Sequence, residues 1–167
     1  YRPQVEGGDT SIPIEETEFE NWRFVMSVNI DGMFLGSQAV GRALLDDGRR
    51  GSIVNLASMS GFIANRGRKN SAYCTSKGAV VMFTREAATE WSEHGIRINA
   101  IAPGYIKTEG ARAVQDPEVA KSINEVTPVR RIGVPEDLQG AAVYLASDAS
   151  DFMTGQTLII DGGYTLW

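Results

Sequence analysis

Tyr73-Cys74-Thr75-Ser76-Lys77 is the stretch of sequence from which the fold can be worked out. It begins a long apolar, Ala-rich segment, Ser71 to Glu93, whose pattern predicts a helix. On a helix, Tyr73 and Lys77 share one face, one turn apart. A free phenol ionises near pH 10, but an ammonium about 4–5 Å away stabilises the phenolate by roughly 3–4 kcal/mol at an effective dielectric near 20. The pair can therefore do acid/base work, although such a pair taken alone is usually a surface contact.

Short β-branched runs on either side of this helix predict buried strands. They alternate with helical segments, and this order is typical of βαβ units and a mainly parallel sheet. Ser58 directly follows the first run, at the carboxyl end of a strand, where open α/β sheets bind ligands, although a serine there is more often a plain turn residue. The predicted strands are Ser52 to Ala57, Arg97 to Ala102 and Thr157 to Ile160. Only about three strands are visible, and the glycine-rich dinucleotide fingerprint is absent.

Composition sets the class of protein. The chain has 167 residues, 43% of them hydrophobic, which suits a single domain over residues 1–167. A net charge of −5 argues against a nucleic-acid partner. Cys74 is the only cysteine, so neither an internal disulfide nor a cysteine-based metal site is expected. No apolar run is long enough to cross a membrane and no signal peptide opens the chain, so we expect no metal, no membrane contact and a reducing, cytoplasmic setting.

The segments around the Tyr73 helix add further expectations. Thr17 and Glu20 fit a capping box that begins a helix running to about Leu45. Asn29 falls on the apolar stripe of that helix, where its amide needs a partner, and a structural asparagine bonded to nearby backbone is the simple interpretation. The Tyr73 helix is apolar on more than one side, which predicts a second helix or another subunit against it. Residues 105 to 131 are long for a connection and favour a lid or substrate loop, and Pro135 is predicted as the first residue of a last helix.

These motifs together resemble the short-chain dehydrogenase/reductase family, over essentially the whole chain. The matching segments occur in family order and near family spacing. They are Val28-Asn29-Ile30-Asp31-Gly32, Ile53 to Ser58, Tyr73 to Lys77, Asn99 to Gly104 with Ile106 and Thr108, Thr154-Gly155-Gln156, and Asp161-Gly162-Gly163. The resemblance implies an α/β fold, namely a Rossmann-like doubly wound parallel sheet whose N-terminal half is missing from this chain.

The resemblance also implies a role for each matching residue. Tyr73 would transfer the proton to or from the substrate oxygen, and Lys77 would favour its ionised form and hold the nicotinamide ribose. Ser58 would bind the substrate oxygen, with Ser60 as an alternative serine, and Asn29 would hold a relay water. Further cofactor contacts would come from the loop after the second strand, at Pro103, Gly104, Ile106 and Thr108. The implied chemistry is NAD- or NADP-dependent interconversion of a secondary alcohol and a ketone.

Substrate and assembly follow only by analogy. The ending Asp161 to Trp167 and the Ala57 to Gly61 segment look like those of family members that act on sugar alcohols or sugar acids. A 3-oxoacyl reductase-type substrate, or a non-catalytic fragment without the nucleotide-binding half, are the alternatives. The small-molecule partner is expected to be an alcohol or ketone, and the family implies a homotetramer or homodimer. The preference between NAD and NADP is not readable from these residues.

Overall fold

A three-stranded parallel sheet forms the centre of the molecule. The computed structural model describes residues 12–65 and 67–167. Within them the strands are β1 (Gly51–Leu56), β2 (Ile96–Pro103) and β3 (Thr157–Ile160), and β2 lies in the middle. Gly51 pairs with Ile96 and Leu56 with Ile101, so β1 and β2 run in register to their carboxyl ends. The predicted strands and the parallel α/β class are confirmed, with strand ends shifted by one residue.

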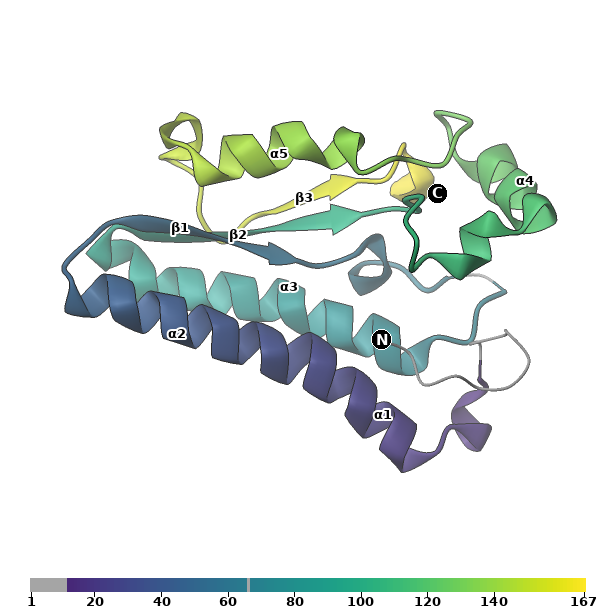
Figure 1. The fold of residues 1–167 in the computed structure, drawn as a ribbon, viewed down its shortest axis with the longest axis horizontal. Helices are drawn as coiled ribbons and strands as arrows, with labels where there is room; N and C mark the ends of the chain where they lie inside the picture. The colour runs from purple at the N-terminus through teal and green to yellow at the C-terminus, as the bar shows by residue number, and fades with distance from the viewer. Residues whose placement is uncertain (1–11, 66) are drawn as a thin grey trace.

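Helices cover both faces of this sheet. Figure 1 shows α2 and α3 along one face and α5 along the other, with α4 beyond the carboxyl ends of the strands. The α-helices of the described residues are α1 (Phe19–Met26), α2 (Gly32–Asp46), α3 (Ser71–Trp91), α4 (Pro117–Val126) and α5 (Glu136–Ala146). None of the helices in the described part of the chain is both long and apolar enough to span a bilayer.

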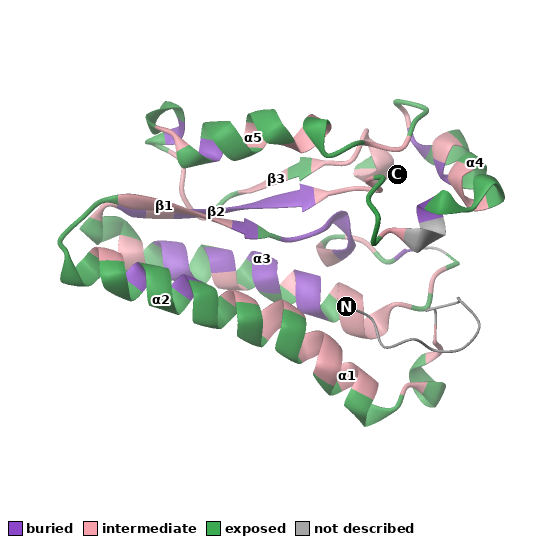
Figure 2. Cartoon of the chain, viewed as in Figure 1, coloured by how far each residue is buried: buried purple, intermediate pink, exposed green. Residues whose placement is uncertain are grey.

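The core lies between α3 and the sheet. Val80 and Val81 of α3 pack with Ala57 and with the small residues Ala100 and Ala102 of β2. Small side chains on the strand let the helix approach closely, so this part of β2 is buried on both sides. Figure 2 shows the buried residues concentrated on β2 and on the side of α3 that faces it. The prediction that α3 is buried on more than one side agrees with its contacts to the sheet and to α1.

The first helix differs from its prediction in two ways. Thr17 donates its hydroxyl to the Pro13 carbonyl at 2.8 Å, and Glu18 precedes the helix without a side-chain cap, so the predicted capping box is wrong. The helix is also divided, because Ser27–Asp31 forms one π-helical turn between α1 and α2. A π turn widens the helix locally and is frequent at functional sites. Asn29 lies in this turn.

The last third of the chain is held to the sheet by two polar side chains of β2, Arg97 and Asn99. Arg97 donates to the Ser147 carbonyl at 3.0 Å and to the Ser150 hydroxyl at 2.8 Å. Asn99 is fully buried, and its amide donates to the Met153 carbonyl at 2.8 Å. These bonds satisfy carbonyls beyond the end of α5 and fix the turn that leads into β3. Pro135 stands just before α5 rather than as its first residue, which corrects that prediction by one position.

Candidate active site

Ser58 lies at the carboxyl end of β1, as the sequence predicts. The Ala57 amide still donates to the Ile101 carbonyl at 2.8 Å, so strand pairing continues up to the residue before Ser58. The Ser58 hydroxyl then accepts the Ser60 amide at 3.2 Å, and the Ser58 carbonyl accepts the Gly61 amide at 2.9 Å. Both serines are about 7% exposed. The turn therefore fixes the position of Ser58. Its hydroxyl oxygen accepts one hydrogen bond within the turn, and its hydroxyl proton can still be donated to another group.

Gly61 brings this turn against helix α3. A Cβ atom at Gly61 would stand 2.8 Å from the Lys77 carbonyl oxygen and 2.9 Å from its carbon. Contacts this short to backbone are not tolerated, so only glycine permits the approach. The close approach is what sets the Ser58 turn beside the first turns of α3, which carry Tyr73 and Lys77.

Lys77 is buried beside the tyrosine. Its side chain is 9% exposed, and its Nζ donates to the Leu56 carbonyl at the end of β1 at 2.8 Å. The same nitrogen lies 5.7 Å from the centre of the Tyr73 ring. Burial lowers the pKa of the Lys77 ammonium from its ordinary value, because the charged form loses water.

Asn29 reaches α3 from the π turn. Its amide nitrogen donates to the Ser76 hydroxyl at 2.9 Å, and that hydroxyl donates to the Tyr73 carbonyl at 2.7 Å. Ser76 is fully buried, and both bonds are partly buried. Asn29 thus fastens the widened first helix to the turn that carries Tyr73 and Lys77. The simple interpretation, a bond to nearby backbone, is wrong for its amide nitrogen, because the partner is a side chain 47 positions away.

The four residues expected at the cofactor lie at the end of β2 and in the loop that follows it. Pro103 ends that strand, and the Gly104 amide donates to the Ile160 carbonyl of β3 at 2.9 Å. Ile106 forms a parallel bridge with Gly133, in which the Tyr105 carbonyl and the Lys107 amide make the hydrogen bonds. In such a bridge the amide of Ile106 itself points away from Gly133. Thr108 is exposed further along the loop.

Two residues that sequence reasoning missed complete the arrangement. Gly61 was not among the predicted site residues. Asn65 stood in a segment that its charges marked only as a basic loop. Asn65 is 8% exposed, and its Nδ2 donates to the Ser60 hydroxyl at 2.8 Å and to the Cys74 sulfur at 3.4 Å. It therefore connects the Ser58 turn to the residue after Tyr73, and no sequence signal pointed to it.

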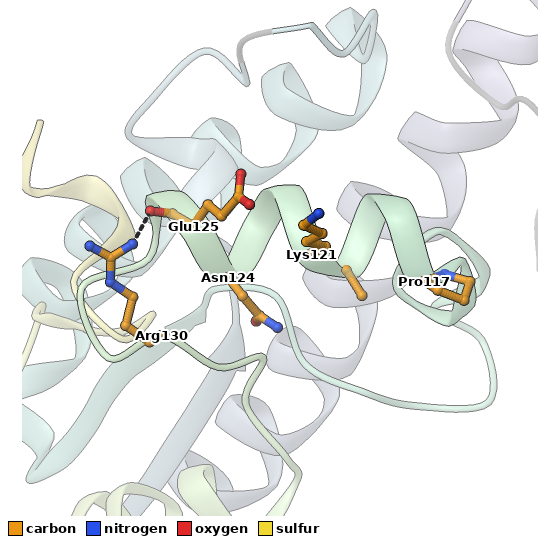
Figure 3. A pocket seen from close by; sticks show the side chains of 6 residues that line it. Pro117, Lys121, Asn124, Glu125 and Arg130 are labelled. Atoms are coloured by element: carbon orange, nitrogen blue, oxygen red, sulfur yellow. Dashed lines mark hydrogen bonds between the residues drawn. The ribbon is translucent and has the colours of Figure 1, made fainter.

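A separate hollow lies beside α4. It encloses about 380 Å³ and is lined by Pro117, Ala120, Lys121, Asn124, Glu125 and Arg130. Figure 3 shows Arg130 reaching back to the carbonyl of Glu125 across its rim. None of the residues expected to act in catalysis lines it. The hollow is therefore separate from the predicted catalytic residues, which lie at the end of β1, in the π turn and at the start of α3.

The fold and the site define a class of protein: a parallel α/β domain with serine, tyrosine and lysine gathered at the carboxyl ends of its strands. The family model described as enoyl-(acyl carrier protein) reductase matches residues 6–165. The chain is 48% identical over 153 residues to a galactitol 2-dehydrogenase (L-tagatose-forming) of Cereibacter sphaeroides, covering 91% of this chain and 60% of that protein. It is 43% identical over 155 residues to gluconate 5-dehydrogenase of Gluconobacter oxydans, covering 92% of this chain and 59% of that protein.

Solved structures agree with this class. A short-chain type dehydrogenase/reductase from Mycobacterium marinum superposes with a TM-score of 0.89 at 41% identity, covering 94% of this chain and 61% of that one. A gluconate 5-dehydrogenase from Burkholderia cenocepacia, in complex with NADP and tartrate, gives a TM-score of 0.89 at 38% identity, covering 95% and 62%. The chain belongs to the short-chain dehydrogenase/reductase family. It spans about 60% of the length of the curated relatives it matches.

Proposed function

We propose that the protein is an NAD- or NADP-dependent oxidoreductase that interconverts a secondary alcohol and a ketone, with sugar alcohols and sugar acids as its substrate class. One observation carries the proposal. The Lys77 ammonium is buried at the end of β1, within 5.7 Å of the Tyr73 ring, on the side where Gly61 holds the Ser58 turn. The relatives named above support the substrate class, since they act on galactitol and gluconate by name.

The residues divide the chemistry between them. Tyr73 moves the proton to or from the substrate oxygen, and Ser58 donates its hydroxyl proton to that same oxygen. Lys77 favours the phenolate through its charge. Asn29 holds the Tyr73 turn from behind through Ser76 and, in the proposal, also keeps a water that relays protons from Lys77 to solvent. The site is closed to water on the Lys77 side. Electrostatic interactions between these groups and the substrate are therefore stronger there than in solution.

The donor set in this region fits a nicotinamide cofactor. The Lys77 ammonium has three N–H donors, and within the described residues only one is spent, on the Leu56 carbonyl. The amide of Ile106 points away from the bridge with Gly133, toward the side where a carboxamide oxygen can accept it. Pro103, Gly104 and Thr108 would line the same ring and its amide. A bound nicotinamide supplies the hydride donor or acceptor, and the protein supplies position and the proton.

Exposed apolar residues on α2 and α3, and at the end of the chain, support a homodimer or homotetramer. Phe34, Leu35 and Met82 are 43%, 58% and 58% exposed, and Leu166 and Trp167 are 75% and 79% exposed. Large apolar patches on a protein surface mark contacts with other chains. Light scattering after size exclusion is expected to give a mass of two or four chains, and a monomer at micromolar concentration would refute the assembly. The single cysteine, a free thiol, agrees with a reducing, cytoplasmic setting.

The experiment that tests the function is the substitution Tyr73→Phe. Activity is measured as the change in absorbance at 340 nm with polyols, sugar acids and a 3-oxoacyl thioester, the last because the family model names an acyl-carrier reductase. The assay uses the extended form, which carries ahead of residue 1 the glycine-rich half found in family members. We expect loss of at least about 10²-fold in kcat with cofactor affinity unchanged, because only the phenolic proton donor is removed. Native-like turnover by the variant would reject Tyr73 as the proton donor.

A further inference from the structure

Asn65 has a buried polar atom without a hydrogen-bond partner in the described part of the chain, which is rare in protein interiors. Its side-chain oxygen is buried, and no described residue donates to it. A buried acceptor without a partner costs about 1–3 kcal/mol. Exchanging the oxygen and nitrogen of the amide does not remove the conflict, because one end of the amide faces Ser60 and Cys74 and the other end faces no partner. Such exceptions gather at functional sites, so the contacts that Asn65 does make deserve a functional explanation.

Those contacts fix the hydroxyl of Ser60. The Ser60 oxygen accepts the Asn65 amide at 2.8 Å, which directs the hydroxyl proton of Ser60 away from Asn65. Ser60 is as buried as Ser58, and its backbone amide is bonded to the Ser58 hydroxyl at 3.2 Å. The two serines therefore lie on one turn, two residues apart, and each hydroxyl accepts one hydrogen bond and keeps a proton to donate. The same Asn65 nitrogen also donates to the Cys74 sulfur, so Asn65 connects Ser60 to the residue that follows Tyr73.

We propose that Ser60, positioned by Asn65, donates a hydrogen bond to a second oxygen of the substrate, on the carbon next to the reacting one. The site then favours vicinal diols and α-hydroxy ketones over simple secondary alcohols and ketones. Because the Ser60 amide is bonded to the Ser58 hydroxyl, a substrate oxygen bound by Ser58 would bring an oxygen on the neighbouring carbon towards Ser60. Ser58 serves the reacting oxygen and Ser60 its neighbour. This inference rests on the proposed oxidoreductase function and narrows its substrate class.

The test compares 2,3-butanediol with 2-butanol in the extended form. The native protein is expected to use the diol with a kcat/KM at least about tenfold higher, which corresponds to one hydrogen bond of about 1.4 kcal/mol. Ser60→Ala is expected to lower kcat/KM for the diol about tenfold, mainly through KM, and to leave the value for 2-butanol unchanged. Asn65→Leu is expected to lower kcat/KM for the diol by a larger factor than it lowers the value for 2-butanol. Asn65→Leu is also expected to unfold at no lower denaturant concentration than the native chain, because the substitution removes an unpaired buried oxygen.

Asn124→Ala is the matched control. Asn124 also has a buried side-chain oxygen without a partner in the described chain, but it lies on α4 beside the separate hollow. We expect it to change neither kcat/KM. Equal losses for the diol and for 2-butanol in the Ser60 and Asn65 variants would overturn the inference, as would a native protein without preference for the diol. Absence of turnover with every alcohol tested, in the native extended form, would instead reject the proposed function itself.

Discussion

Gly61→Ala tests the close approach on which the site depends. The new Cβ would stand 2.8 Å from the Lys77 carbonyl oxygen, whereas ordinary contact begins at 3.4 Å. The turn or the helix must therefore move by about 0.6 Å, the difference between these two distances. The atoms it meets are helix backbone, which cannot rotate aside, so the Ser58 turn is the part that moves. Overpacking of this kind costs about 1–3 kcal/mol.

Two measurements follow from this displacement. In urea, the unfolding midpoint of the chain is expected to fall by about 0.5–1.5 M, since the free energy changes by about 2 kcal/mol per molar for a small domain. In the extended form, kcat is expected to fall about tenfold or more, because a displacement near 1 Å at a reacting centre can cost about 10²-fold. KM for the cofactor is expected to change little, because the Ser58 turn moves and the helix backbone that carries Lys77 stays in place.

The control for this substitution is Gly36→Ala on α2. No atom outside its own helix lies within 4 Å of a Cβ at Gly36, and the residue is helical. Alanine there is expected to stabilise the chain by about 0.5–1 kcal/mol, because it restricts the unfolded chain more than glycine does. If Gly61→Ala were as stable as Gly36→Ala and kept native kcat, the contact between the turn and α3 would not hold the site together.

Two further predictions concern buried cations. Burial lowers the pKa of Lys77, so the unfolded chain binds the lysine proton more tightly than the folded chain does. The contribution of Lys77 to the free energy of unfolding therefore rises with pH, from the folded-state pKa up to the ordinary value of 10.5. The stability of the native chain relative to Lys77→Met, followed by urea unfolding from pH 7 to 10, is expected to increase, and a flat or falling difference would contradict the shift. Arg97→Met removes donors from the carbonyls of Leu145 and Ser147 and is expected to destabilise the chain by about 2–4 kcal/mol. Arg49→Met, at a side chain 66% exposed, is its control and is expected to stay within about 0.5 kcal/mol, and equal effects of the two substitutions would contradict a structural role for Arg97.

The sequence predicted the parts of the fold that depend on periodicity. β-branched runs located the three strands of the described sheet, and the apolar pattern after Tyr73 located α3. Both succeeded because the face of a strand or helix that is buried recurs at a fixed spacing of apolar residues. The capping box failed for the opposite reason. The hydroxyl of Thr17 had a competing partner in the Pro13 carbonyl, and a local motif cannot reveal which partner a side chain takes. The π turn at Asn29 was not predictable either, since one extra residue in a helical turn leaves the apolar stripe nearly unchanged.

The site shows the same division between local pattern and long-range contact. Tyr73 and Lys77 were recognisable because helical spacing places them on one face, and Ser58 because a strand ends there. Lys77, however, owes its position to a carbonyl of β1, 21 residues earlier, and Asn29 to a hydroxyl 47 residues later. Gly61 acts through its approach to Lys77 on α3, and Asn65 through bonds to Ser60 and Cys74, five and nine residues away. The chemistry of the site was therefore readable from residue types, whereas its geometry is set by a glycine and an asparagine whose importance appears only when β1 and α3 are brought together.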